Sequence, residues 1–203
     1  EAEKLHRLRT AAAGKFSAAV ESGLKAVALE KARFEVRVER PSPDQMTADA
    51  AGRAMSASGF DSVEFFFSAN AGESPKPLGK VASGGEAARV MLVIKTTGKD
   101  SGGHRTSIFD EVDTGIGGRV AEAVGQKLRT LAANRQVLCV THQPQVASKA
   151  DRHFLIEKSM SRNATLIGVR ELGPDEQVEE IARMLAGETV TDAARSNARE
   201  MLA

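Results

Sequence analysis

Two adjacent carboxylates, Asp110 and Glu111, follow a short apolar run and are candidates for chemistry on a bound phosphate. The run over residues 106–109 predicts a buried strand, and open α/β sheets bind their ligands at the carboxyl ends of their strands. In nucleotide-hydrolysing enzymes an Asp at this place helps to hold the Mg²⁺ that bridges the phosphates. Because successive side chains of a strand point in opposite directions, the two acids need separate roles. We assign Asp110 to the metal and Glu111 to a water that it would orient or deprotonate, and a plain solvated strand end is the alternative.

A second candidate is the run Ser83, Gly84, Gly85 and Glu86, which opens a predicted helix. The two glycines let the backbone approach a ligand closely, and the free N–H groups of a helix start favour an anion. The Ser83 hydroxyl adds a further donor. The alternative is a capped helix start that binds nothing, because Ser83 and Glu86 also have the spacing of a capping box.

A histidine, His142, directly follows the next predicted strand, residues 136–141. If the two strands are neighbours, this imidazole lies level with Asp110 and Glu111, where it could hydrogen-bond the γ-phosphate or the attacking water. The alternative is a packed or helix-capping histidine. Asp113, two residues beyond Glu111, is interpreted as a turn or cap residue, or as a contact across a subunit interface.

The composition excludes several other functions. The 203 residues suffice for one large domain or two small ones, and 28 Lys and Arg against 27 Asp and Glu leave a net charge of +1, with no general attraction to nucleic acid. Eight Phe and no Trp or Tyr make base stacking an improbable mode of recognition. Cys139 lies in an apolar run and is interpreted as a small buried hydrophobe. No signal peptide or apolar run of membrane-spanning length is evident, so we expect a reducing, cytosolic setting without a membrane partner.

Periodicity and turn residues predict an α/β fold. The strand–helix–strand–helix order from residue 106 to residue 150 implies parallel strands with right-handed crossovers. The first helix is predicted as an amphipathic helix and a possible base of a coiled coil, and the start of the chain on Glu1 within this pattern suggests a fragment. The predicted helices are residues 1–30, 83–97, 117–132, 144–150, 174–186 and 191–203, the other predicted strands are 33–40, 62–68, 152–158 and 164–171, and the predicted loops are 41–59, 69–78 and 98–105.

Three phrases of the sequence together carry a specific resemblance. They are VASGGE at 81–86, IFDEVDTGIGG at 108–118 and THQPQVA at 141–147, and EIARML at 180–185 adds to them. In this order they resemble the ATP-binding cassette ATPases, most closely the bacterial DNA-repair relatives of the structural-maintenance-of-chromosomes (SMC) proteins. The likeness extends from about Arg33 to the end of the chain.

The resemblance implies a fold and a role for each matched position. Residues 32–203 would form the C-terminal lobe of an ATPase head, a mainly parallel sheet flanked by helices, preceded by a helix over residues 1–31. Ser83 to Glu86 would be the signature motif, which in this family touches the γ-phosphate of a nucleotide held by the opposite head. Asp110 would be the Walker-B metal acid, Glu111 the catalytic base, Asp113 the D-loop acid and His142 the switch histidine.

The phosphate-cradling Walker A motif is absent from the sequence. Each of the three Gly-Lys pairs is followed by a residue other than Ser or Thr, namely Phe16, Val81 or Asp100. The resemblance implies that an N-terminal half of the same head supplies this loop through a long coiled coil, so the chain alone should not turn over ATP.

The resemblance also implies cofactors and partners. The cofactors would be ATP and Mg²⁺, and the partners the N-terminal half, a second head in a homodimer, and DNA. The setting would be the bacterial cytoplasm near the nucleoid, and the activity double-strand-break repair and recombination. The alternatives are a dimerisation or DNA-association module without catalysis, and half of another ATPase of the same superfamily.

Overall fold

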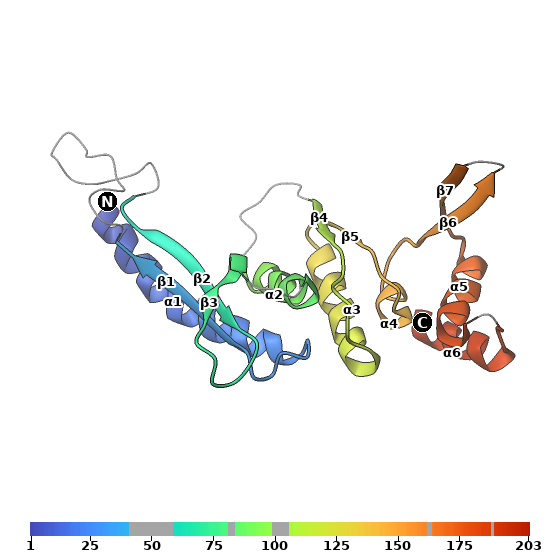
Figure 1. The fold of residues 1–203 in the computed structure, drawn as a ribbon, viewed down its shortest axis with the longest axis horizontal. Coiled ribbons are helices and arrows are strands. Elements are labelled where there is room, and N and C mark those ends of the chain that lie inside the picture. Colours follow the sequence, from blue (N-terminus) through green and yellow to red (C-terminus); the bar gives the residue numbers. More distant parts are fainter. Residues whose placement is uncertain (41–58, 81–83, 99–105, 162–163, 188) are drawn as a thin grey trace. The chain divides into compact units, whose positions relative to one another are not determined.

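The computed structural model describes residues 1–40, 59–80, 84–98, 106–161, 164–187 and 189–203. The chain divides into two compact units, Glu1–Gly103 and His104–Ala203 (Figure 1). Ser83, most of the predicted loop 41–59 and most of the predicted turn 98–105 lie outside the described residues. The predicted separation of residues 1–31 as a coiled-coil base stays a prediction.

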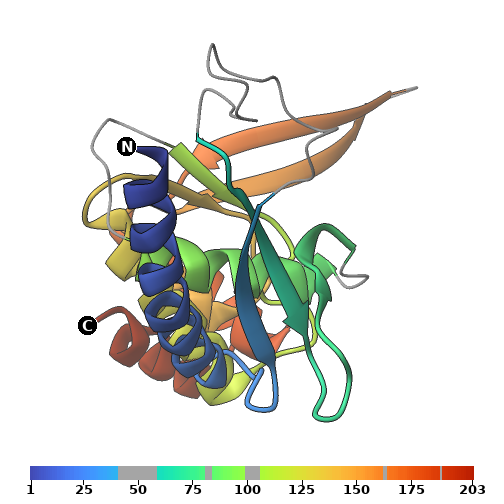
Figure 2. The same ribbon diagram turned by 90° about the vertical axis from the view of Figure 1, so that its left-hand side faces the viewer.

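In the first unit a long helix packs along an antiparallel sheet with the strand order β1-β2-β3 (Figure 1, Figure 2). Alternation places Phe34 of β1 and Phe65 of β2 on the face toward the helix, where their rings and that of Phe16 lie 5.5–6.3 Å apart. The elements are α1 (Ala2–Lys25), β1 (Arg33–Glu39), β2 (Ser62–Ser68), β3 (Lys76–Pro77), the 3₁₀ turn η2 (Leu78–Lys80) and α2 (Gly84–Thr97).

The chain leaves α1 earlier than the sequence predicts. The N–H groups of Val27 and Leu29 both donate to the Leu24 carbonyl, at 3.0 and 3.2 Å, and Ala28 between them has a left-handed φ of 59°. This bend buries both Val27 and Leu29, so tertiary packing overrides a continuous helical pattern. The prediction of loop over residues 69–78 is also wrong at its end, because β3 pairs with β2.

The second unit begins with two neighbouring parallel strands, β4 and β5, joined through α3. The inward residues of α3 recur at helical spacing, and they are Ala121, Val124, Leu128 and Leu131. The elements are β4 (Thr106–Phe109), α3 (Gly118–Ala132), β5 (Gln136–Cys139), α4 (Pro144–Ala147), β6 (Phe154–Ser161), β7 (Ala164–Glu171), α5 (Pro174–Ala186) and α6 (Asp192–Leu202).

The α/β class is confirmed, but parallel pairing is limited among the described strands to β4 and β5. The expected mainly parallel sheet is therefore corrected for this part of the chain: β1-β2-β3 and β6-β7 are antiparallel. For β6 and β7 the reason is the connection, since residues 162–163 are too few for the crossover that a parallel pair requires.

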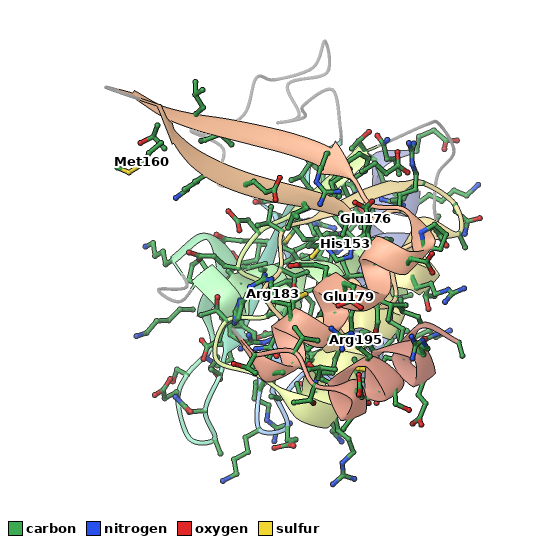
Figure 3. The ribbon with its side chains drawn as sticks, turned by 90° about the vertical axis from the view of Figure 1, so that its right-hand side faces the viewer. His153, Met160, Glu176, Glu179, Arg183 and Arg195 are labelled. Carbon is green, nitrogen blue, oxygen red and sulfur yellow. The ribbon has the colours of Figure 1, made fainter. Side chains whose placement is uncertain are left out.

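The β6-β7 hairpin is exposed over most of its length. Met160, near its far end in Figure 3, is 94% exposed. Near its base the Arg152 guanidinium donates from Nε to Glu171 at 2.6 Å, and Arg170 donates to Glu176 of α5 at 2.6 Å. The hairpin is of a kind that is marginally stable by itself, and the exposed Arg170–Glu176 pair links its base to α5.

Helices α4, α5 and α6 share a small apolar core. Its buried members are Ala147, Ile181, Ala182 and Ala198. Helix α5 begins at Pro174 and ends before Gly187, whose φ is 79°, as its sequence predicts. On the surface, Arg183 pairs with Glu180, and Arg195 of α6 pairs with Glu179 of α5. In the described ranges we find no helix with both the length and the apolar character that crossing a membrane requires.

Candidate functional site

The pairing of β4 with β5 brings two sequence-predicted site segments to one edge of the sheet. Phe109 and Cys139 are partners in the parallel register, and the Val140 N–H donates to the Phe109 carbonyl at 2.9 Å. Asp110 and Glu111 thus leave β4 at the edge where His142 follows β5. The expectation that these two strands are neighbours is confirmed.

The turn after β4 separates the two acids. The Glu111 N–H donates to Asp110 Oδ1 at 2.9 Å, and Glu111 has a left-handed φ of 58°. A non-glycine residue in this conformation costs about 1–2 kcal/mol, so the surrounding turn must hold it there. One contact that does so is the Thr114 N–H bond to the Glu111 carbonyl at 3.0 Å. Both carboxylates are exposed to solvent, where a ligand can reach them.

Asp113 has a different environment, because its side chain is 3% exposed. Its Oδ2 accepts hydrogen bonds from the Thr141 hydroxyl and from the His142 backbone N–H, the latter at 3.0 Å. The interpretation of Asp113 as a local turn or cap residue is therefore incomplete, since its carboxylate ties the β4 turn to the segment after β5. Its proposed contact across a subunit interface stays a prediction.

The His142 side chain extends from these hydrogen bonds of Asp113 toward solvent. Its ring Nδ1 lies 3.3 Å from Asp113 Oδ2, its Nε2 lies 3.2 Å from the Gln143 side-chain nitrogen, and its side chain is 70% exposed. The Gln143 N–H donates to the Thr141 hydroxyl oxygen at 3.0 Å. The Thr141 hydroxyl therefore bonds both Asp113 and Gln143, whose side chains lie next to the two ring nitrogens of His142. Sequence reasoning missed Thr141 and Gln143. A hydroxyl and an amide on either side of a strand-end histidine were the available signal.

Helix α4 starts directly beyond this segment and packs closely on α3. A Cβ on Gly125 of α3 would lie 3.0 Å from the Gln145 carbonyl oxygen and 3.3 Å from the Val146 Cα. Gly125 therefore permits the approach of two backbones that fixes where the histidine segment ends.

Cys139, the partner of Phe109 in the β4-β5 register, is half-buried, less than the sequence predicts, and does not contribute a nucleophile. Burial raises the pKa of its thiol to about 12, and the charges of Asp113 and Asp110 add to the effect. The thiol is therefore protonated at neutral pH and unreactive, as its apolar surroundings in the sequence predict.

The predicted signature motif lies in the other unit. Gly84, Gly85 and Glu86 form the first turn of α2, Gly85 is buried, and Ser83 precedes the described part of the helix. Burial lowers the pKa of Arg89, one turn further along, and the charge of Glu86 opposes this shift. A meeting of this motif with a nucleotide on another head stays a prediction.

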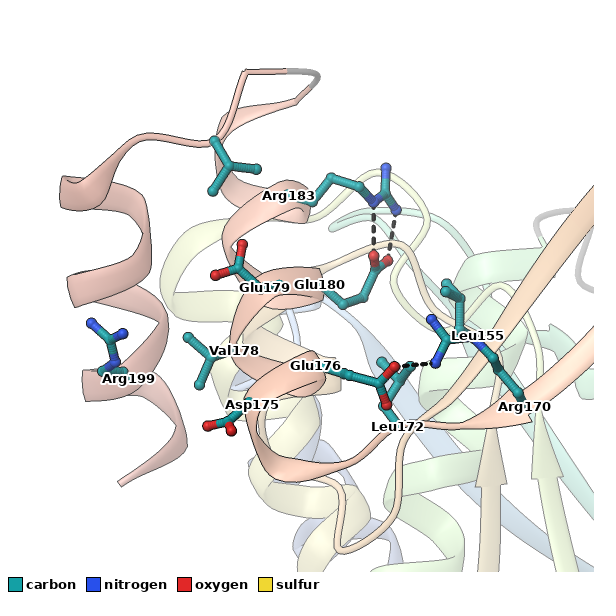
Figure 4. A pocket seen from close by; sticks show the side chains of 11 residues that line it. Leu155, Arg170, Leu172, Asp175, Glu176, Val178, Glu179, Glu180, Arg183 and Arg199 are labelled. Carbon is teal, nitrogen blue, oxygen red and sulfur yellow. Dashed lines mark hydrogen bonds and ion pairs between the residues drawn. The ribbon is translucent and has the colours of Figure 1, made fainter.

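A separate hollow of about 650 Å³ lies between the hairpin base, α5 and α6 (Figure 4). None of the sequence-predicted site residues lines it. Its carboxylates outnumber its guanidinium groups, and Arg170 and Arg183 are already paired with Glu176 and Glu180. Such a lining has no excess of positive charge for a triphosphate.

Comparison with known proteins identifies the relatives of this chain. No protein-family model matches it. It is 42% identical over 202 residues to the DNA repair protein RecN of Halalkalibacterium halodurans, 40% over 206 residues to RecN of Bacillus subtilis, and 40% over 203 residues to RecN of Streptomyces coelicolor. The chain is RecN-like along its whole length. These matches cover 99–100% of the chain and 34–36% of the relatives, so the chain spans about a third of their length.

Solved structures place the RecN-like chain in a known fold. The Smc head domain with a coiled coil and joint derived from Pyrococcus yayanosii matches with a TM-score of 0.52 and 15% identity, covering 86% of this chain and 29% of that one. The Smc head domain with an extended coiled coil bound to the C-terminal domain of ScpA, derived from Pyrococcus furiosus, matches with a TM-score of 0.50 and 18% identity, covering 88% and 38%. At these identities the likeness concerns the fold alone, and it extends over 29% and 38% of those two head-domain chains.

Proposed function

We propose that this RecN-like chain is the C-terminal half of an ATPase head that acts in DNA double-strand-break repair and recombination. The observation that carries the proposal is the convergence of Asp110, Glu111 and His142 at one edge of β4 and β5, in a chain about 40% identical to RecN proteins. In this proposal ATP binding closes two heads and hydrolysis reopens them, so that nucleotide chemistry controls how DNA is held.

Asp110 fits the role of a Mg²⁺ ligand. One of its oxygens accepts the Glu111 N–H, and the carboxylate is exposed. Mg²⁺ often takes only one or two protein carboxylates and completes its shell with waters and phosphates, so a single exposed Asp is a sufficient protein ligand. When bound, Mg²⁺ neutralises charge on the β- and γ-phosphates.

Glu111 is proposed as the base that orients the attacking water and takes its proton. The left-handed turn at Glu111 changes the chain direction immediately after Asp110, which supports separate tasks for the two acids. His142 is proposed as a second group on the same water or on the γ-phosphate.

The start of α2 is proposed to act on the nucleotide of a second head. Ser83, Gly84, Gly85 and Glu86 supply a hydroxyl and a helix start, and helix N-termini favour phosphate. Two such heads form a homodimer in this proposal, with one nucleotide between each signature motif and the opposite acids.

The N-terminal half of the head is proposed to supply the Walker A loop. Exposed apolar side chains support a missing neighbour, because Ile108, Leu138 and Val140 lie uncovered on β4, β5 and the residue that follows. Exposed Leu5 and Leu8 on α1, at heptad-compatible spacing, support residues 1–31 as the base of a coiled coil.

The test combines this chain with an N-terminal half that carries the Walker A loop and measures phosphate release. The change Glu111→Gln should leave ATP binding intact and lower turnover by about a hundredfold or more, because the base is lost and the shape is kept. The matched control is Glu122→Gln, an exposed acid of α3, which should leave the rate unchanged.

Undiminished hydrolysis by Glu111→Gln would remove the proposed role of Glu111. Absence of hydrolysis under every pairing would favour the other candidate, a dimerisation or DNA-association module without catalysis.

A further inference from the structure

The protonation pattern of the His142 ring follows from its two neighbours. Asp113 is an acceptor, and its Oδ2 lies 3.3 Å from Nδ1. An unprotonated Nδ1 would place its partial negative charge 3.3 Å from a buried carboxylate oxygen, which is repulsive. The proton of the neutral ring therefore belongs on Nδ1.

The contact at the other ring nitrogen is compatible with the same tautomer. The side-chain nitrogen of Gln143 lies 3.2 Å from His142 Nε2. An amide nitrogen carries only donors, so it matches an Nε2 that presents a lone pair. Both contacts are compatible with one tautomer, with Nδ1 protonated and Nε2 free to accept.

Two donors meet on one buried oxygen, and the His142 ring lies beside it. The Thr141 hydroxyl and the His142 backbone N–H donate to Asp113 Oδ2, and the ring Nδ1 lies 3.3 Å from the same oxygen. A carboxylate that holds both the backbone and the ring of one histidine limits rotation of that ring, much as a carboxylate behind a metal-bound histidine sets its orientation.

We propose that Asp113 is a positioning residue that keeps His142 in the Nδ1–H tautomer, so that Nε2 accepts a hydrogen bond from the attacking water. In this state the neutral ring does not donate to the γ-phosphate. The Gln143 amide covers Nε2 until the water takes its place. This inference rests on the proposed function and chooses between the two roles that the sequence left open for His142.

The test is ¹⁵N NMR of the 203-residue chain with labelled histidine, at about pH 8.5, where an ordinary histidine is neutral. The variant His142→Gln assigns the signals among the four histidines. We expect wild-type His142 to show a protonated Nδ1 and an unprotonated Nε2. In Asp113→Ala the ring should shift to mainly Nε2–H, the form that prevails for a histidine side chain in water.

The matched control is Thr141→Val. Both variants break the bond between Thr141 and Asp113, but only Asp113→Ala removes the acceptor that faces Nδ1, so Thr141→Val should keep the wild-type tautomer. A wild-type ring protonated on Nε2, or the same tautomer in Asp113→Ala as in wild type, would overturn the proposal. The wild-type spectrum decides the question even if Asp113→Ala does not fold.

Activity offers a second readout once the two halves hydrolyse ATP together. If Asp113 acts through His142, adding Asp113→Ala to His142→Ala should lower turnover no further, whereas additive losses would place Asp113 in another role. The NMR result needs neither ATP nor the other half. Its failure is therefore distinguishable from a failure of the proposed ATPase.

Discussion

Asp61 in the first unit and Asp113 in the second are both buried carboxylates that face a histidine, with side chains 1% and 3% exposed. Asp61 contacts two basic side chains of α1: His6 Nδ1 at 2.6 Å and Arg9 Nη1 at 3.1 Å. Asp113 instead accepts from a hydroxyl and a backbone N–H.

The histidines differ accordingly. His6 is 23% exposed and lies in the contact between α1 and the residue before β2, whereas His142 is 70% exposed. The comparison shows that one pairing can serve two purposes. Basic partners on a helix turn a buried carboxylate into a tie between elements, while neutral donors let it orient a ring that a ligand can still reach.

The largest expected effect is on stability. Asp61→Ala should lower the free energy of unfolding by about 3 kcal/mol, because it removes the buried acceptor that His6 and Arg9 share. Asp113→Ala should cost less, about 1–2 kcal/mol, because its donors are neutral and lie beside an exposed histidine that water can reach. Urea denaturation of both variants measures the difference.

The control for this pair is Asp151→Ala, an exposed acid that should change stability by less than about 0.5 kcal/mol. Equal losses in the free energy of unfolding for Asp61→Ala and Asp113→Ala would contradict the comparison, because they would show that basic and neutral donors make these carboxylates equally important for stability.

Lowering the pH should weaken the contact of Asp61 with His6 and Arg9 of α1. Burial acts to raise the pKa of this carboxyl, and hydrogen bonds from His6 and Arg9 outweigh it, so the pKa is lowered. A lowered folded pKa means that the stabilisation is complete above the unfolded value of about 3.9 and is lost as pH falls below it. Unfolding free energies of wild type and Asp61→Asn between pH 6 and pH 3 should converge at the acid end. Parallel curves would contradict the assignment.

The smallest effect on stability is expected for His153, where the group with a shifted pKa is a base and not a carboxylate. Burial lowers its pKa, with Glu180 opposing, and its Nδ1 is buried without a hydrogen-bond partner among the described residues. The unfolded chain therefore binds more protons near pH 6.5, and stability should fall as pH drops below that value. His153→Gln should flatten this dependence between pH 7.5 and pH 5.5, and an unchanged slope in urea melts would assign it to other groups.

Much of the site could be predicted because its signals are local. The apolar run before Asp110 and the one before His142 each indicate a strand, and the helical pattern between them indicates a crossover, so the two strand ends were expected to meet. The helix boundaries followed from the fixed φ of Pro174 and from the freedom of Gly187 to adopt a positive φ. Packing was harder to predict, because an amphipathic pattern does not say which apolar residues become buried: Val20 and Leu24 of α1 are buried, whereas Ala12 is exposed.

The sequence alone therefore determined the order of the strands and helices apart from β3, the placement of the two acids and the histidine at strand ends, and the likeness to RecN. Only the tertiary structure decided what Asp113 does, because its partners Thr141 and His142 lie 28 and 29 residues away. Periodicity reports which face of an element is apolar. It does not report which donors will meet a particular oxygen once water has been excluded from around it, and that outcome sets the orientation of the histidine.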